Sequence, residues 1–142
     1  MTEILTRRFG AIRYEETDVV HFPAGLPGFE ARTRFVLVER SASAPLVFMQ
    51  SVESPELCFC CTPLAAIDPN YQLAMTEEDQ RLLAATEQPL CLAILSSDKT
   101  GRWTANLLAP VVIDLASRRG VQAVRADSRY SHCHPLGGAS CS

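Results

Sequence analysis

The chain has 142 residues, a formal net charge of -3 at pH 7 and 47% hydrophobic residues. A chain of this size forms one domain and can bury enough apolar surface to fold without metal or disulfide staples. The acidic balance argues against a nucleic-acid-binding protein. No apolar run reaches the ~18 to 20 residues of a membrane-spanning helix, and the N-terminal residues do not resemble a signal peptide. We therefore expect a cytoplasmic globular domain that contacts neither membrane nor nucleic acid directly.

Turn signals interrupt the apolar stretches every ~8 to 12 residues, a spacing typical of an all-β sandwich or barrel. The first stretch, residues 9–20, is divided by a polar turn at residues 15–18. It is followed by residues 22–29, the Pro-Gly loop, in which two prolines and two glycines exclude regular structure and require special backbone angles. We expect this loop to be held by its own apolar members, Phe22, Leu26 and Phe29.

The rest of the chain is predicted to contain short strands and one peripheral helix. The strands are expected at residues 34–39, 46–52, 57–62, 90–95, 103–107, 111–114 and 121–126. The helix is predicted to begin after Thr76, whose hydroxyl can cap the first turn, and to end before Pro89. A short helical turn is predicted at residues 115–119. Residues 1–136 then form a single domain, and residues 137–142, with almost no apolar content, a flexible tail.

Catalytic motifs are absent from the sequence, which has no glycine-rich phosphate loop, no zinc-protease motif and no nucleophile elbow. His21 lies beside the Pro-Gly loop and three residues after Asp18, but no nucleophile can be assigned to this pair, which favours a structural histidine. We expect no enzyme activity.

The six cysteines are interpreted as reduced thiols because no export signal accompanies them. They are Cys58, Cys60, Cys61, Cys91, Cys133 and Cys141. On a strand Cys58 and Cys60 face one side and Cys61 the other, so their sulfurs do not converge on a metal. Small buried apolar residues are the favoured interpretation. The alternative function is a small metal or redox protein that combines these cysteines with His132 and His134.

Charged clusters suggest two further hypotheses. Acidic residues gather in the early turn, at Glu15, Glu16 and Asp18, and at the predicted helix start, residues 77–79. Most simply these are solvated, and the alternative is a docking site for a basic partner. Direct RNA binding would have to use Arg118 and Arg119, or Arg125 and Arg129, which have few aromatic residues around them.

The most specific signal is a collinear series of short motifs. The series comprises the Pro-Gly loop with Glu30, Met49-Gln50-Ser51, Leu57-Cys58-Phe59 with Pro63, Asn70-Tyr71, residues 104–113, residues 120–124, Tyr130, and Pro135-Leu136. Taken together over residues 6–136, these motifs closely resemble the FliW family of flagellar assembly factors.

The resemblance implies a mainly β fold: a small antiparallel barrel-like domain with one or two short helices. It also implies that the protein has no catalytic activity, no cofactor and no metal. Members of the family bind flagellin, the filament subunit, and in many bacteria also CsrA, a small basic RNA-binding translational regulator. Sequestering CsrA frees flagellin messenger RNA for translation. Flagellin and CsrA are therefore the expected partners.

The resemblance also assigns positions that bind a partner or support a binding surface. These are Phe22, Gly25, Leu26, Pro27, Gly28, Phe29, Gln50, Ser51, Asn106, Leu107, Pro110, Gln122 and Tyr130. Two features depart from the family pattern. Cys133 stands where an arginine is usual, and the cysteine-rich strand replaces the usual Ala, Val or Ile, which agrees with a packing role for the cysteines.

Overall fold

The computed structural model describes residues 1–83, 89–125 and 129–136. The expected flexible tail, residues 137–142, lies outside the described residues. Within the described ranges, no helix is both long enough and apolar enough to cross a membrane.

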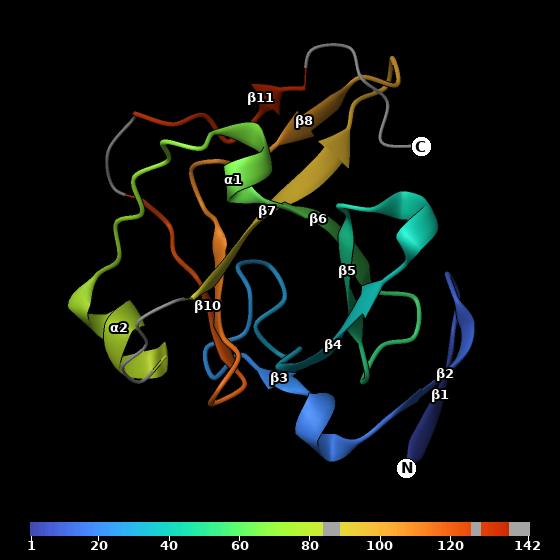
Figure 1. Ribbon diagram of the computed structural model, residues 1–142. Coiled ribbons are helices and arrows are strands. Elements are labelled where there is room, and N and C mark those ends of the chain that lie inside the picture. Colours follow the sequence, from blue (N-terminus) through green and yellow to red (C-terminus); the bar gives the residue numbers. More distant parts are fainter. Residues whose placement is uncertain (84–88, 126–128, 137–142) are drawn as a thin grey trace.

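Seven strands form a closed barrel (Figure 1). They are β3 (Val20–His21), β4 (Arg34–Glu39), β5 (Val47–Ser51), β6 (Cys58–Pro63), β7 (Leu90–Ser97), β9 (Val111–Asp114) and β10 (Arg119–Gln122). Pairing of β7 with β9 closes the ring. All neighbours in it are antiparallel except β3 and β10, which run parallel. The predicted mainly β, barrel-like fold is therefore confirmed, with one parallel pairing in it.

Additional strands extend or flank the barrel. The last residues of β7 pair with β8 (Trp103–Ala105), which pairs in turn with β11 (His134–Pro135). β1 (Thr2–Thr6) and β2 (Gly10–Tyr14) form a separate hairpin. The sequence gives no clear sign of β1 or β11, because β1 is largely exposed and β11 has two residues. Two short 3₁₀ helices, η1 (Glu16–Asp18) and η2 (Ser41–Ser43), lie between strands.

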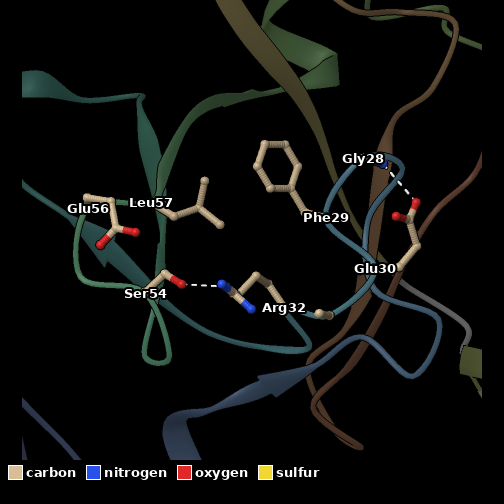
Figure 2. Close-up of a pocket in the computed structure, with 8 residues that line it drawn as sticks. Gly28, Phe29, Glu30, Arg32, Ser54, Glu56 and Leu57 are labelled. Atoms are coloured by element: carbon tan, nitrogen blue, oxygen red, sulfur yellow. Dashed lines mark hydrogen bonds between the residues drawn. The ribbon is translucent and has the colours of Figure 1, made fainter.

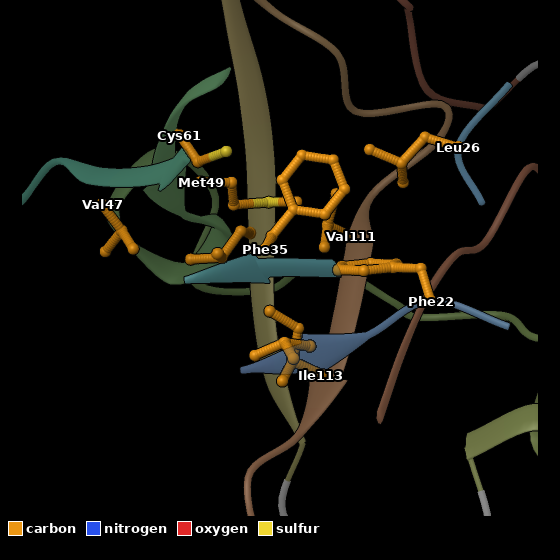
Figure 3. Packing of buried hydrophobic residues seen from close by; sticks show 10 residues of the cluster. Phe22, Leu26, Phe35, Val47, Met49, Cys61, Val111 and Ile113 are labelled. Atoms are coloured by element: carbon orange, nitrogen blue, oxygen red, sulfur yellow. The ribbon is translucent and has the colours of Figure 1, made fainter. Parts of the chain in front are cut away.

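The barrel core consists of inward-facing residues of the strands together with two side chains of the Pro-Gly loop (Figure 3). Phe35, Met49 and Val111 are fully buried strand residues, and Phe22 and Leu26 enter the same cluster from the loop. The rings of Phe22 and Phe35 meet edge to face, with centroids 5.6 Å apart. Burial of each such side chain contributes ~1.5 to 3 kcal/mol, so the loop is part of the fold.

In the described ranges, two short helices lie outside the barrel. They are α1 (Leu64–Ile67), for which the residue pattern gives no signal, and α2 (Glu77–Leu83). The predicted cap of α2 is confirmed, because the backbone N–H of Asp79 donates to Thr76 Oγ1 at 3.0 Å. Leu83 is buried and packs on the outer face of β9 and β10, which fixes α2 against the barrel.

The prediction for the segment after β9 is wrong in two respects. Residues 115–118 form a tight turn rather than a helical one, because Asp114 accepts a hydrogen bond from Ala116 and Arg118 adopts a positive φ of 57°. The strand predicted at residues 121–126 is β10, which begins at Arg119 and ends at Gln122. Beyond it, the N–H groups of Ala123 and Arg125 donate to loop carbonyls at 2.8 and 3.0 Å, and residue 126 lies outside the described residues.

Candidate functional site

The Pro-Gly loop is a series of tight turns closed at its base. Phe22 N–H donates to the carbonyl of Thr33 at 2.8 Å, which joins the two ends of the loop. Within the loop, Gly25 N–H donates to Phe22 and Phe29 N–H donates to Leu26, at 2.8 and 2.7 Å. These three hydrogen bonds pair backbone groups of the loop with one another and with its base. They therefore define the shape of the loop.

Both glycines of this loop have left-handed backbone angles, as predicted. Gly25 has φ of 67° and Gly28 has φ of 86°. A Cβ on Gly25 would lie 2.5 Å from the backbone oxygen of Glu30, whereas a Cβ on Gly28 would meet nothing within 4 Å. Gly25 is therefore required by both conformation and space, and Gly28 by conformation alone.

The apolar members of the loop divide into buried and exposed ones. Of the three side chains expected to hold the loop, Phe22 and Leu26 are buried in the core, whereas Phe29 is 41% exposed and contributes through one side of its ring only. The Phe29 ring contacts Phe59 edge to face, at 5.4 Å between centroids, and its remaining surface faces outward. Pro27 is also exposed. The Pro-Gly loop therefore places the ring of Phe29 on the protein surface.

Gln50 and Ser51 shape the neighbouring loop, residues 52–57, between β5 and β6. Gln50 Nε2 is buried and donates to the carbonyls of Ser51, Pro55 and Leu57 at 3.0 to 3.2 Å. Ser51 Oγ accepts hydrogen bonds from the backbone N–H groups of Glu53 and Ser54. These two polar side chains at the end of a buried strand thus determine the path of the loop.

Direct contacts join this loop to the exit of the Pro-Gly loop. Glu53 Oε1 accepts hydrogen bonds from the N–H groups of Thr33 and Arg34, at 2.9 and 3.0 Å. Arg32 Nε donates to Ser54 Oγ (Figure 2). Charge-assisted hydrogen bonds of this kind are stronger than neutral ones. The two loops therefore form one rigid unit.

An open cavity of about 420 Å³ lies between the two loops (Figure 2). It is lined by Gly28, Phe29, Glu30, Ala31, Arg32, Ser54, Glu56 and Leu57. Phe29 and Leu57 provide apolar surface. The carboxylate of Glu30 accepts the N–H of Gly28 at 2.8 Å, while that of Glu56 has no hydrogen-bond partner in the described part of the chain. The cavity can take an apolar side chain with a polar or basic neighbour.

The remaining predicted positions brace the segment after β8. Asn106 Oδ1 accepts the N–H groups of Leu108 and Ala109, at 3.1 and 3.0 Å. Leu107 is buried, and its carbonyl accepts the Tyr71 hydroxyl at 2.6 Å. Desolvation by burial raises the pKa of Tyr71, so this hydroxyl stays a donor. Asn106 and Leu107 therefore act as supports.

Tyr130, Pro110 and Gln122 complete this brace. The ring of Tyr130 stacks on that of Tyr71 at 4.2 Å between centroids, and its hydroxyl accepts the N–H of Gln72 at 3.0 Å. Gln122 Nε2 donates to the carbonyl of Ala109 at 2.9 Å, and the carbonyl of Pro110 accepts Ala123 N–H. The predicted positions thus fall into two groups: the Pro-Gly loop with Gln50 and Ser51, and this brace.

The cysteines behave as packing residues, with a correction to their burial. Cys61 is completely buried in the barrel core, whereas Cys58 and Cys60 are only partly buried, so the prediction that all three are buried is wrong. Cys60 lies in a different cluster from Cys61, as the strand alternation predicts. Desolvation raises the pKa of the Cys58 thiol to about 11 and that of Cys61 further, which disfavours thiolates. Cys141 lies outside the described residues.

No group of three or more His, Cys, Asp or Glu side chains suited to a metal occurs in the described part of the chain. His132 is exposed, and His134 lies in β11, where it pairs with Ala105. The metal or redox alternative thus gains no geometric support from these ranges.

Most of the charged residues singled out in the sequence have partners within the chain. The guanidinium carbon of Arg125 lies 5.0 Å from the centroid of the Tyr130 ring, and Arg118 donates a hydrogen bond to the carbonyl of Asp18. Both side chains are thus engaged within the chain, which does not favour RNA binding through them. In the early acidic turn, Asp18 Oδ2 accepts the N–H of Glu15 at 2.8 Å. Glu77 and the adjacent Glu78 are exposed on α2. The acidic residues of α2 therefore remain the better docking candidate.

No motif of the sequence marks Arg32, Ser54, Glu56 and Leu57, which line the cavity together with the Pro-Gly loop. The segment Glu53-Ser54-Pro55-Glu56 has the composition of an ordinary turn. Its place beside the Pro-Gly loop follows from the pairing of β4 with β5, which sets Phe35 opposite Ser51.

Comparison with known proteins gives consistent similarities. The family described as "FliW protein" matches residues 3–136. The flagellar assembly factor FliW of Syntrophomonas wolfei is 34% identical over 137 residues, covering 94% of this chain and 88% of that protein. FliW of Bacillus subtilis is 30% identical over 141 residues, covering 97% and 99%. A crystal structure of the flagellar assembly factor FliW matches with a TM-score of 0.85 at 30% identity, covering 95% of this chain and 96% of that one.

Proposed function

Because the chain belongs to the FliW family, we propose that it is a flagellar assembly factor that acts by binding proteins and without catalysis. Its partners are flagellin and the translational regulator CsrA. Binding of CsrA sequesters it and relieves repression of flagellin translation. The site of action is the cytoplasm.

The observation that carries this proposal is the exposed ring of Phe29 at the edge of a preformed cavity. Aromatic side chains that stand on rigid supports are typical anchors of protein interfaces, and a few of them provide most of the binding energy. The loop that carries Phe29 is fixed by buried Phe22 and Leu26. Little conformational entropy is lost when such a surface binds a partner, which supports binding as its role.

The charge distribution supports a basic second partner. The chain has a net charge of -3, and α2 begins with three acidic residues, Glu77, Glu78 and Asp79. Glu77 and Glu78 are exposed. Exposed charges accelerate the encounter with an oppositely charged protein and are screened by salt. CsrA is basic, so this surface suits it better than it suits a neutral or acidic protein.

The test of the proposal is calorimetric titration of flagellin and, separately, of CsrA into the purified protein and its Phe29→Ala variant. Loss of an interface anchor costs ~2 kcal/mol or more, so we expect affinity for at least one partner to fall by about 30-fold. Leu5→Ala is the matched control, because Leu5 is another exposed large apolar residue, on β1. Unchanged affinity for both partners in a folded Phe29→Ala variant would contradict the role of this ring. Absence of binding by the parent would contradict the function.

A further inference from the structure

A second open cavity, of about 410 Å³, lies where β3 meets β10, outside the Pro-Gly cavity. Its lining residues are His21, Phe22, Pro23, Thr33, Ser117 and Arg119. His21 and Arg119 are direct partners across the parallel strands, which lie side by side (Figure 1). Both side chains are exposed, and so is Ser117. The polar part of this cavity therefore consists of a guanidinium, an imidazole and two hydroxyls.

His21 and Arg119 belong to a row of side chains on the outer face of the barrel. Residues that pair directly across strands point to the same face of a sheet. The successive pairings set Asp114 beside Arg119, Arg119 beside His21, and His21 beside Arg34. Their sequence neighbours Ile113, Gly120, Phe22 and Phe35 face inward, in contact with the core. The row thus carries two permanent positive charges, with a histidine between them.

One of the two arginines already holds a carboxylate. Arg34 Nη2 donates to both carboxylate oxygens of Glu16, at 2.6 and 2.8 Å. Asp114, at the other end, accepts hydrogen bonds from Ala116 N–H and Ser117 Oγ. The side chain of Arg119, by contrast, has no hydrogen-bond or ion-pair partner in the described ranges. The imidazole of His21 has none in these ranges either.

The position of Arg119 is fixed by the residue before it. Arg118 has a left-handed backbone, its carbonyl accepts the N–H of His21 at 2.8 Å, and its Nη2 donates to the carbonyl of Asp18. The turn between β9 and β10 is thereby tied to the segment that carries His21. The backbones of Arg119 and His21 are therefore held side by side before any ligand arrives, which removes backbone ordering from the cost of binding one.

We propose that the cavity between β3 and β10 is a binding site for a carboxylate side chain of an acidic protein segment, held by Arg119 with His21 beside it. A guanidinium can bind a carboxylate through two parallel N–H donors. In the same row, Arg34 already binds a carboxylate, because its Nη2 donates to both oxygens of Glu16. A doubly charged phosphate suits the cavity less well, because the carboxylates of Glu16 and Asp114 flank it. The site is distinct from the acidic surface that suits a basic partner.

The test uses nuclear magnetic resonance titrations of the full chain, following the Arg119 Nε–H and His21 ring signals. The probe is the blocked peptide acetyl-Glu-Ala-Ala-Glu-amide, compared with its Gln counterpart, inorganic phosphate and a short single-stranded RNA. We expect the glutamate peptide to shift both signals saturably. Arg119→Gln should weaken its binding by about tenfold, the loss expected for one charge-assisted hydrogen bond. His21→Gln should weaken it less, and Arg119→Lys should restore part of it.

Arg13→Gln is the matched control, because Arg13 is an exposed arginine of β2 that pairs with Glu3. Its binding of the glutamate peptide should equal that of the parent. Equal binding of the glutamate and glutamine peptides, equal loss in Arg13→Gln, or tighter binding of phosphate or RNA than of the glutamate peptide would each overturn the proposal. Because flagellin and CsrA are absent from this experiment, its outcome is independent of the proposed function.

Discussion

The ring of Phe22 occupies the space that a side chain at position 120 would need: a Cβ on Gly120 would lie 2.6 Å from Phe22 Cε2. Phe22 is fully buried and is itself packed on Phe35, so it cannot move aside freely. This contact joins the start of the Pro-Gly loop to β10. The Pro-Gly loop can therefore take its observed position only because residue 120 is a glycine.

Gly120→Ala should destabilise the protein by ~1 to 3 kcal/mol, the usual cost of overpacking a core. The free energy of unfolding would be measured by urea denaturation. Gly101→Ala serves as the comparison without a clash: a Cβ there would meet nothing within 4 Å, so its φ of 82° alone should cost ~1 kcal/mol. Adding Phe22→Leu to Gly120→Ala should recover part of the lost stability, because the two residues are in contact. Parent-like stability of Gly120→Ala would show that the ring adjusts.

Gly25→Ala should be more destabilising than Gly28→Ala. Both positions have positive φ, which costs a non-glycine residue ~1 kcal/mol or more, but only Gly25 adds a close approach to the backbone of Glu30. Thermal melting of the two variants and the parent measures the order. If Gly28→Ala lowers the melting temperature as much as Gly25→Ala does, the steric argument for Gly25 fails.

Cys58 should react with iodoacetamide more slowly than Cys133 at pH 8. The thiolate is the reactive form, and burial raises the pKa of Cys58 to about 11, whereas Cys133 is exposed. Mass spectrometry of timed samples gives both rates, and the Cys58 rate should continue to rise as the pH approaches about 11. Cys61 should be protected until the protein unfolds. Faster alkylation of Cys58 than of Cys133 would favour a reactive, functional thiol.

Asp98 should stabilise the β7–β8 hairpin at neutral pH but not in strong acid. Its Oδ1 accepts hydrogen bonds from the Thr100 hydroxyl, at 2.7 Å, and from the N–H groups of Thr100 and Arg102, which lower the pKa of the carboxyl. A lowered pKa in the folded state means that the contribution is present above about pH 4 and is lost as the pH falls through the lowered value.

The measurement is the free energy of unfolding of the parent and of Asp98→Asn at several pH values. The parent should be the more stable at pH 7, and the difference should shrink as the pH is lowered to about 2. If the parent and Asp98→Asn differ in free energy of unfolding by the same amount at pH 7 and at about pH 2, the effect comes from the geometry of the turn and not from the charge of Asp98.

The sequence predicts elements well where a continuous apolar run of four or five residues lies between turn signals. β4 has the predicted boundaries, and β5 and β6 differ from their predictions by one residue at each end. The turn after Asp114 has a composition that suits a helical turn equally well, and a left-handed residue that is not glycine, Arg118, has no sequence signal.

The candidate site can be predicted only in part from the sequence, because its cavity lies between two loops that are separated along the chain. The glycines and prolines mark the Pro-Gly loop by their chemistry, and both glycines have the predicted backbone angles. The contribution of Arg32 and Ser54 depends on the pairing of β4 with β5, which brings together residues 22 positions apart. The exposure of Phe29 depends on how the loop turns after Leu26, and periodicity cannot indicate it.

A protein that binds both flagellin and CsrA can link flagellin translation to flagellin export only if the two partners bind antagonistically. Since coupling free energy is reciprocal, flagellin and CsrA must weaken each other's binding by the same factor, and a useful switch needs ~1 to 3 kcal/mol, or about 5 to 150-fold. The direct measurement is a titration of flagellin into a preformed complex of this protein with CsrA, with release of CsrA followed by fluorescence anisotropy. We expect flagellin to release CsrA. The affinity of the CsrA complex for flagellin should be lower than that of the free protein, by the same factor by which flagellin lowers the affinity for CsrA. A stable ternary complex in which both affinities equal those of the separate pairs would contradict the account.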